Sequence, residues 1–314
     1  MSLELRRREM MAQVAERQPN NQIWYWRENN TIATLYSSSK FLSNIVSHEK
    51  VGKKFVITFD SDLTESTDVL RGVGNLSKIT LPNSIITITA YAFKDTQTKT
   101  RNNGIELVLP KNLTTINAYG LAGDLLYTFP STLKYLGYLS CSSNYALKSI
   151  TIPASVTTMA TGSGNTECRV FDNCLNLSTI NVEEGNEYFY SENSCLIRKS
   201  NKRLIAVPSI DEVFVPEGVK LIGYGSASAG VRNPKIIHLP STITELQSYS
   251  FLSASSVKTI ICKSINPPKM YNNTFYYTNP TAIYVPNDSV EAYKAADIWS
   301  TIADRIKPIS ELPQ

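Results

Sequence analysis

The chain has 314 residues, of which 42% are apolar and 18% are charged, and this balance excludes an intrinsically disordered protein. The formal net charge of +4 is small and the basic residues are scattered apart from Arg6–Arg8, so we expect no nucleic-acid partner. No stretch approaches the roughly 18 consecutive apolar residues that cross a bilayer, so we expect no membrane span.

The start of the chain differs from the rest in composition. Residues 1–20 are interpreted as an N-terminal helix or as a tag plus a linker, because residues 3–17 have helix-forming composition and the Met-Ser-Leu start is typical of a vector scar. This basic segment lacks the apolar region of a signal peptide, which leaves the compartment open.

Residues 21–70 are predicted to form an N-terminal β cap. Residues 22–35 contain two runs rich in apolar and β-branched side chains, separated by Glu28–Asn30. This pattern predicts a hairpin that turns at those three residues. Residues 54–59 alternate in a way that is typical of a further strand.

An internal repeat occupies residues 71–262. Its clearest copy, residues 76–93, reads L-x-x-I-x-L-P-x-x-I-x-x-I-x-x-Y-x-F. In most copies a proline follows the first apolar run, and these prolines are Pro82, Pro110, Pro130, Pro153, Pro216 and Pro240. The first four are 28, 20 and 23 residues apart and the last two are 24 apart, a unit length typical of leucine-rich repeats.

Each repeat has two parts with different periods. Apolar residues at positions −3 and −1 before the proline predict a short strand with one buried face, which the proline ends because it has no N–H to donate. Apolar residues at +3, +6 and +9 then predict a return segment in which every third side chain faces inward. A single unit loses about 1–2 kcal/mol of backbone entropy per ordered residue, so we expect stability only when units stack.

One repeat, residues 160–208, is enlarged, and its strand lacks the closing proline. The segment from Gly162 to Thr166 is typical of an inserted loop. Further on, residues 195–205 contain two apolar runs separated by Lys199–Lys202. This arrangement predicts a hairpin that turns at those residues.

Residues 263–314 are predicted to form a C-terminal cap. A helix is expected over residues 290–306, because Asp288 and Ser289 are residue types that cap helix N-termini. Trp299 lies within that segment, and we expect it to cover the open end of the repeat core.

The repeat and two end features resemble the BspA-like leucine-rich repeat family of bacteria. Asn21–Tyr25 is similar to that family's N-terminal hairpin, and Cys262–Pro268 with Ile283–Lys294 is similar to its C-terminal cap. The resemblance covers about residues 21–308. It implies a mainly β leucine-rich-repeat solenoid, a right-handed superhelix of short strands with short helical caps at both ends. It also implies a cell-surface or secreted protein that adheres to host proteins or other cells.

The cysteines and histidines indicate no catalytic or metal chemistry. The five cysteines are an odd number without a C-x-x-C motif, and the only two histidines, His48 and His238, are far apart in sequence. We therefore predict no catalytic residue, no cofactor and no metal, and expect that the protein is not an enzyme. Cys174 and Cys262 lie at positions typical of the family and are interpreted as buried structural thiols.

The 17 tyrosines leave two interpretations open. A surface row of tyrosines would suit the binding of glycans. However, Tyr91, Tyr119 and Tyr249 occupy position +9, where the period of three predicts inward side chains, so we favour a place in the core.

Position −2 before the proline is expected to point away from the core. In the last four units this position holds Phe214, His238, Ile261 and Tyr284, which are larger than the residues of earlier units. If the units stack in order, these residues form an exposed apolar and aromatic patch of the kind that marks interfaces. The alternative is that the C-terminal cap or a loop covers them.

These observations favour a protein-binding or adhesion module with an unidentified protein partner. One alternative is a carbohydrate-binding surface protein, suggested by the tyrosine and asparagine content. Another is a structural component of a phage or mobile element, suggested by the missing signal peptide.

Overall fold

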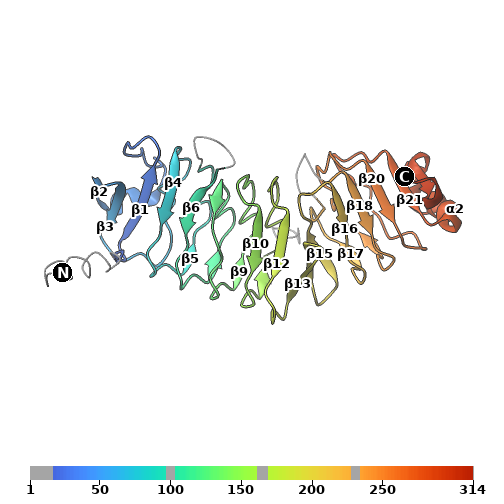
Figure 1. Ribbon diagram of the computed structural model, residues 1–314, viewed down its shortest axis with the longest axis horizontal. Coiled ribbons are helices and arrows are strands. Elements are labelled where there is room, and N and C mark those ends of the chain that lie inside the picture. The colour runs from blue at the N-terminus through green and yellow to red at the C-terminus, as the bar shows by residue number, and fades with distance from the viewer. Residues whose placement is uncertain (1–16, 97–102, 161–168, 228–233, 314) are drawn as a thin grey trace, which may run out of the picture.

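The computed structural model describes residues 17–96, 103–160, 169–227 and 234–313. The helix expected within residues 3–17 and the loop expected at residues 162–166 lie outside these described residues. Figure 1 shows an elongated array of strands that runs from β1 and β2 at one end to α2 at the other. The fold is mainly β with few helices, as the sequence predicted.

The N-terminal strands do not form the predicted hairpin. Strand β1 (Gln22–Arg27) lies between β3 (Lys54–Phe59) and β4 (Leu76–Thr80) and is antiparallel to both. Strand β2 (Ile45–Val51) pairs on the other side of β3. The strand expected over residues 54–59 is therefore confirmed, whereas the hairpin within residues 22–35 is wrong.

Side-chain contacts explain why the chain after β1 stays irregular. The Arg27 guanidinium donates to the carbonyl oxygens of Thr31 and Ile32 at 3.0 Å each and to that of Gly74 at 3.1 Å. The backbone N–H of Ala33 donates to the Tyr25 hydroxyl at 3.0 Å. Because these bonds use the backbone groups of the expected second strand, β1 pairs instead with strands that are distant in sequence.

The repeats contribute two rows of parallel strands. The first row precedes the proline positions; besides β4, it consists of β6 (Ile105–Val108), β8 (Leu125–Leu126), β10 (Ser149–Ile152), β12 (Thr179–Val182), β16 (Glu212–Phe214), β18 (Ile236–Leu239), β20 (Thr259–Cys262), β21 (Ala282–Val285) and β22 (Ile306–Pro308). The second row consists of two-residue strands, which are β5 (Thr87–Ile88), β7 (Thr115–Ile116), β9 (Tyr135–Leu136), β11 (Thr158–Met159), β17 (Leu221–Ile222) and β19 (Glu245–Leu246). Equivalent residues of successive units face each other, as Ile79 and Leu107 do.

The core lies between the two rows. In the repeat that contains Pro82, the inward positions are Ile79, Leu81, Ile85 and Ile88, and each side chain is at most 3% exposed. Stacking repeats these positions along the array, so each unit buries its apolar side chains against those of its neighbours. The predicted inward positions −3, −1, +3 and +6 are thus confirmed in this repeat.

The enlarged repeat inserts antiparallel strands among the parallel ones. Strands β13 (Phe189–Glu192), β14 (Cys195–Arg198) and β15 (Arg203–Ala206) pair in order, and β15 then pairs in parallel with β17. Arg198 faces Arg203 across the predicted turn, so the hairpin is confirmed.

The C-terminal end is not one continuous helix. Helix α2 (Val290–Ala295) ends before Ile298, whose φ of +64° is left-handed, and a 3-10 helix then spans Trp299–Arg305. Trp299 is 1% exposed and donates its indole N–H to the Pro268 carbonyl at 2.7 Å. It also packs edge-on against Tyr293 with ring centroids 5.0 Å apart. The prediction of a single helix over residues 290–306 is therefore wrong, because burying both rings at the end of the core requires a break between them. The side chain of Ser289 also makes no capping hydrogen bond to α2.

Candidate functional site

The residues predicted to form the exposed patch lie on adjacent strands. Phe214 faces His238, His238 faces Ile261, and Ile261 faces Tyr284 across the parallel strands β16, β18, β20 and β21. The expectation that the units stack in order is therefore correct for this part of the array.

The four side chains are not equally exposed. Phe214 is 48% exposed and His238 is partly buried, but Ile261 and Tyr284 are each only 5% exposed. The expectation of an exposed patch is therefore wrong for the last two. They form a small cluster against which Ile309 and Leu312 pack. The chain after β22 thus covers the end of the strand row, which is the alternative that the sequence left open.

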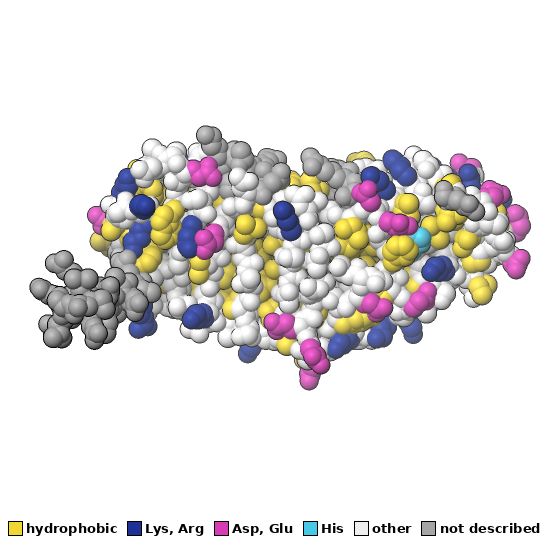
Figure 2. Space-filling view, viewed as in Figure 1, with side chains coloured by type: hydrophobic (Ala, Val, Ile, Leu, Met, Phe, Trp, Pro, Cys, Tyr) yellow, Lys and Arg dark blue, Asp and Glu magenta, His cyan; other side chains and the backbone are white. Residues whose placement is uncertain are grey.

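Phe214 and His238 form a stacked aromatic pair. Their rings are stacked with centroids 4.1 Å apart and an interplanar angle of 15°. The His238 Nε2 atom lies 2.7 Å from Oε1 of Glu212, which fixes the position of the imidazole. Figure 2 shows hydrophobic side chains beside a histidine towards the C-terminal part of the visible face. We call Glu212, Phe214 and His238 the aromatic patch.

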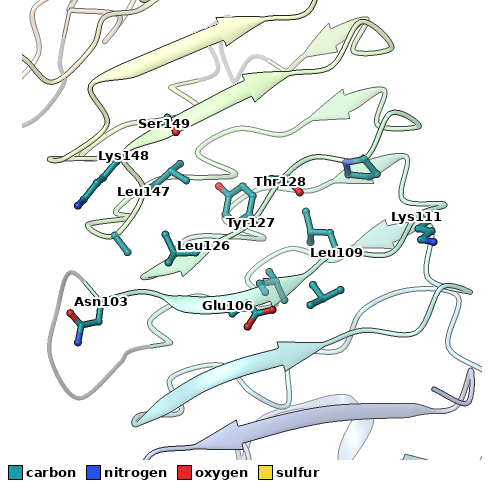
Figure 3. Close-up of a pocket in the computed structure, with 14 residues that line it drawn as sticks. Asn103, Glu106, Leu109, Lys111, Leu126, Tyr127, Thr128, Leu147, Lys148 and Ser149 are labelled. Atoms are coloured by element: carbon teal, nitrogen blue, oxygen red, sulfur yellow. The ribbon is translucent and has the colours of Figure 1, made fainter. Parts of the chain in front are cut away.

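A groove opens on the same strand row in the N-terminal half, as Figure 3 shows. It has a volume of about 810 Å³ and lies over β6, β8 and the start of β10. Val108 and Leu126 line it and are 39% and 38% exposed, so two apolar side chains on neighbouring strands meet solvent in one groove. We call this feature the strand-gap groove.

Two features of the sequence point to the strand-gap groove, although the sequence analysis did not predict it. Val108 is an apolar residue at the outward position −2, and Leu126 is an apolar residue at the outward position −4. The spacing of Pro110 and Pro130, 20 residues, is the shortest in the array. A short unit leaves less chain for a full-length strand, and β8 has only two residues.

The tyrosines predicted to lie in the core are at the surface. Tyr91 is 39% exposed, Tyr119 and Tyr249 are partly exposed, and the expectation of core positions is wrong. All three have a left-handed backbone, with φ of 63°, 56° and 59°. The left-handed residue reverses the chain locally, so the period of three ends there and the following Ala92 and Phe93 face inward instead.

These tyrosines belong to a longer surface row that spans several repeats. We define the tyrosine row by its members Tyr91, Tyr119, Tyr138, Tyr224, Tyr249 and Tyr276. Neighbouring rings within each half of the row have centroids 5.1 to 6.1 Å apart. The Lys94 ammonium lies 5.5 Å from the Tyr91 ring and 5.3 Å from the Tyr119 ring, so cation–π contacts reinforce the row.

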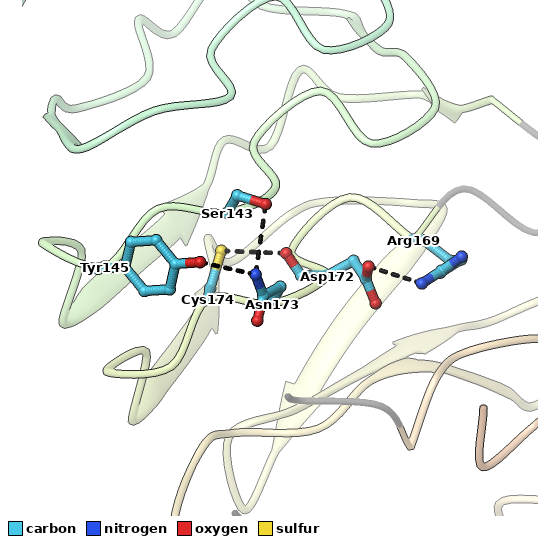
Figure 4. Close-up of polar contacts among 6 residues, drawn as sticks. All are labelled: Ser143, Tyr145, Arg169, Asp172, Asn173 and Cys174. Atoms are coloured by element: carbon cyan, nitrogen blue, oxygen red, sulfur yellow. Dashed lines mark hydrogen bonds and ion pairs between the residues drawn. The ribbon is translucent and has the colours of Figure 1, made fainter. Parts of the chain in front are cut away.

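Arg169 links the two halves of the tyrosine row across the enlarged repeat. Its guanidinium lies 5.8 Å from the Tyr224 ring and is held by Asp172 through an Nη2–Oδ2 contact of 2.6 Å (Figure 4). The neighbouring Asn173 amide donates to the Tyr145 hydroxyl at 2.9 Å. These contacts order the turn of a unit that has arginine where the clearest copy has tyrosine.

The cysteines of the described residues are buried. Cys174 and Cys262 are 2% and 0% exposed, so their interpretation as buried thiols is confirmed. Burial is the main cause that raises the pKa of the Cys141 thiol to about 11 and that of Cys195 to about 12. Thiols with such pKa values are protonated and unreactive near neutral pH. Cys168 lies outside the described residues.

The described parts of the chain contain no group of three or more His, Cys, Asp or Glu side chains that could hold a metal ion. Within the same residues, no helix has both the length and the apolar character needed to cross a membrane.

Comparison with known proteins identifies the repeat. A model of the BspA type leucine-rich repeat region matches residues 64–195 and 200–296 in 6 copies. A leucine-rich repeat protein from Eubacterium ventriosum is similar in structure, with a TM-score of 0.51 and 22% identity. The match covers 73% of this chain and 65% of that protein, so the chain spans about 65% of its relative's length.

Two other solved structures match over more of their length but with lower TM-scores. The pneumococcal vaccine antigen PcpA has a TM-score of 0.43 and 15% identity, with 90% of this chain and 96% of that one covered. A leucine-rich cell surface protein from Faecalibacterium prausnitzii has a TM-score of 0.36 and 16% identity, with 87% and 89% covered. A search among curated proteins found no match. Since the family model matches well over half of the 314 residues, the chain belongs to the BspA-type leucine-rich repeat family.

Proposed function

We propose that this protein is a non-enzymatic adhesion module at a cell surface or after secretion, and that it binds a protein partner through the aromatic patch. We further infer that its repeats wind as a right-handed solenoid, in which β16, β18, β20, β21 and β22 form the continuous sheet that carries the aromatic patch. The observation that carries the proposal is the exposed Phe214 ring, which is stacked on His238 and projects from a strand.

The chemistry of the aromatic patch suits a protein interface. Proteins of this repeat family are generally protein-binding, and they are generally not enzymes. An exposed aromatic ring loses little conformational entropy on binding when a neighbouring ring already holds it in place. Glu212 adds a carboxylate beside the ring, and a polar rim around an aromatic anchor is typical of binding hot spots.

Site-specific photo-crosslinking tests this proposal. A benzophenone amino acid is placed at position 214, and a matched variant carries it at position 86. Ile86 is the appropriate control because it is also 48% exposed but lies in the segment after Pro82, outside the first strand row. Both variants are exposed to intact source cells and to host extracellular proteins, and the crosslinked proteins are identified by mass spectrometry.

We expect one dominant protein at position 214 and not at position 86. We also expect Phe214→Ala to reduce retention of that protein by about 30-fold or more, as for a hot-spot residue. Equal crosslinking at both positions contradicts the proposal. Protease treatment of intact cells tests display separately, because a displayed protein is cut while a cytosolic marker survives.

Glycan binding is a second candidate, and the tyrosine row favours it. Rings of this row that meet edge to face, such as Tyr119 with Tyr138 at 86°, leave an aromatic face on which a sugar can stack. A glycan array with the wild type and with Tyr138→Ala tests the candidate. No signal at high protein concentration, or an equal signal from both proteins, removes it.

A further inference from the structure

The first strand row is interrupted between β8 and β10. Strand β8 pairs with β6 only through Leu125 and Leu126, whose partners are Ile105 and Glu106. Strand β10 pairs only with β12, on its far side. Within the described chain, no strand therefore connects the sheet that contains β6 with the sheet that contains β10.

The segment after β8 has unused backbone groups. Thr128 and Phe129 lie outside every strand, and in the described residues neither of them donates or accepts a backbone hydrogen bond. Thr128 is exposed and lines the strand-gap groove, which places this unpaired segment at the edge of the groove. An extended stretch with unpaired N–H and C=O groups is a template on which another strand pairs.

The walls of the groove supply side-chain contacts. Val108, Leu126 and Leu147 give it an apolar lining. In Figure 3, Leu126 and Leu147 both lie on the same side of Tyr127. An extended peptide presents every second side chain to the same face, so alternate apolar residues match this lining.

The charges at the rim are mainly positive. Glu106 lines the groove, but its carboxylate is in an ion pair with Lys78, with an Nζ–Oε1 distance of 2.7 Å. Lys111 and Lys148 also line the groove, and neither has an ion-pair partner among the described residues. An acidic side chain on the ligand complements this rim.

We propose that the strand-gap groove binds an extended peptide segment of a protein partner by strand addition. The peptide backbone pairs with Thr128 and Phe129, its alternate apolar side chains contact Val108 and Leu126, and acidic residues beside them contact Lys111 and Lys148. This site lies in the N-terminal half, away from the aromatic patch. Its occupation therefore does not depend on the function proposed for Phe214.

Selection from a library of random twelve-residue peptides displayed on phage tests the proposal with the full chain. The same library is passed over the wild type, over Leu126→Asp and over Ile86→Asp. The last variant is the matched control, since it also replaces an exposed aliphatic residue with a carboxylate. Thermal unfolding of the three proteins checks that each is folded.

We expect enriched peptides with alternate apolar residues and at least one acidic residue. They bind the wild type and Ile86→Asp equally, and they bind Leu126→Asp at least about tenfold more weakly, which corresponds to about 1.4 kcal/mol. Synthetic versions with N-methyl groups on the pairing amides do not bind, because strand addition needs those N–H donors. Peptides that bind all three proteins equally, or that tolerate N-methylation at every position, overturn the proposal.

Hydrogen exchange provides a readout that needs no variant. In the free protein, the amides of Thr128 and Phe129 are expected to exchange rapidly, because no backbone acceptor protects them. An enriched peptide slows exchange at those two amides if it adds as a strand. Binding without protection at either amide contradicts strand addition even if the side-chain variants weaken binding.

Discussion

The two halves of the first strand row place the same repeat positions in different surroundings. In the C-terminal half, strands β16, β18, β20, β21 and β22 form one unbroken five-stranded sheet, and the chain beyond it buries Ile261 and Tyr284. In the N-terminal half the row stops after β8, and Val108 and Leu126 remain exposed beside the strand-gap groove. Outward-pointing side chains are therefore covered at one end and open at the other.

This difference shows that exposure in a repeat array is decided by neighbours. The backbone of each unit directs position −2 away from the core in both halves. Whether that side chain meets solvent depends on the length of the next strand and on the chain segment beyond the last unit. Since units contact mainly their neighbours, each half should respond to its own defects, and this independence can be measured.

Loss of the terminal lid should have the largest effect. Trp299→Ala removes a ring that is 1% exposed, together with its hydrogen bond to Pro268. We expect a loss of about 3–5 kcal/mol of unfolding free energy, the usual cost of truncating a large buried aromatic residue. Hydrogen exchange should accelerate in β18, β20 and β21 while β4 and β6 keep their protection. Uniform acceleration along the array would show that the two halves unfold as one unit.

Two residues at the same repeat position should differ in their effect on stability. Tyr284→Ala is expected to cost about 3 kcal/mol, because this ring is buried under Leu312. Phe214→Ala should change the unfolding free energy by no more than about 0.5 kcal/mol, because the ring is exposed. Urea unfolding of both variants measures the difference. Similar midpoints for the two would contradict the coverage of Tyr284 by the chain end.

The thiols provide a probe of each half. In a Cys168→Ser background, Cys141 and Cys174 report on the N-terminal half, and Cys195 and Cys262 on the C-terminal half. With its pKa raised to about 11, Cys141 should react with a disulfide reagent at pH 8 about 100-fold more slowly than an exposed thiol. Mass spectrometry after limited urea treatment shows which pair becomes reactive first. Rapid labelling of the native protein would argue against burial.

The smallest expected effect is a pH dependence confined to the N-terminal cap. The Tyr25 hydroxyl lies 2.7 Å from His48 Nε2, and burial lowers the pKa of His48 below its usual value of 6.5. The unfolded chain therefore binds the proton more readily than the folded one. The stabilisation is complete above about pH 6.5 and is lost as the pH falls towards the lower folded pKa.

A comparison with His48→Gln isolates this contribution. Acidification from pH 7 to pH 5.5 should lower the melting temperature of the wild type by about 1–2 °C more than that of the variant. Hydrogen exchange should assign the difference to β1, β2 and β3. An identical pH response of the two proteins would exclude His48 as its source.

Local contacts explain which sequence-based predictions succeeded. The short strands before the prolines, the inward positions −3, −1, +3 and +6, and the hairpin at Lys199–Lys202 all follow from short-range patterns that the structure keeps. The predicted inward place of Tyr91 failed at the single left-handed residue that ends the period of three. The hairpin at residues 22–35 failed because Arg27 and Tyr25 use the backbone groups of its second strand.

The residue pattern is enough to predict the repeat, its family, the alternation of buried and outward positions, and the place of Phe214 beside His238 on adjacent units. These properties repeat every 20 to 28 residues and depend on the side chain and its nearest units. The three-dimensional structure was needed to show that Ile309 and Leu312 cover Tyr284, that β8 does not pair with β10, and that the tyrosines form a surface row. The first two features depend on contacts that occur once in the array, and a repeating pattern carries no information about them. The tyrosine row recurs, but it depends on a left-handed backbone conformation that the spacing of apolar residues does not reveal.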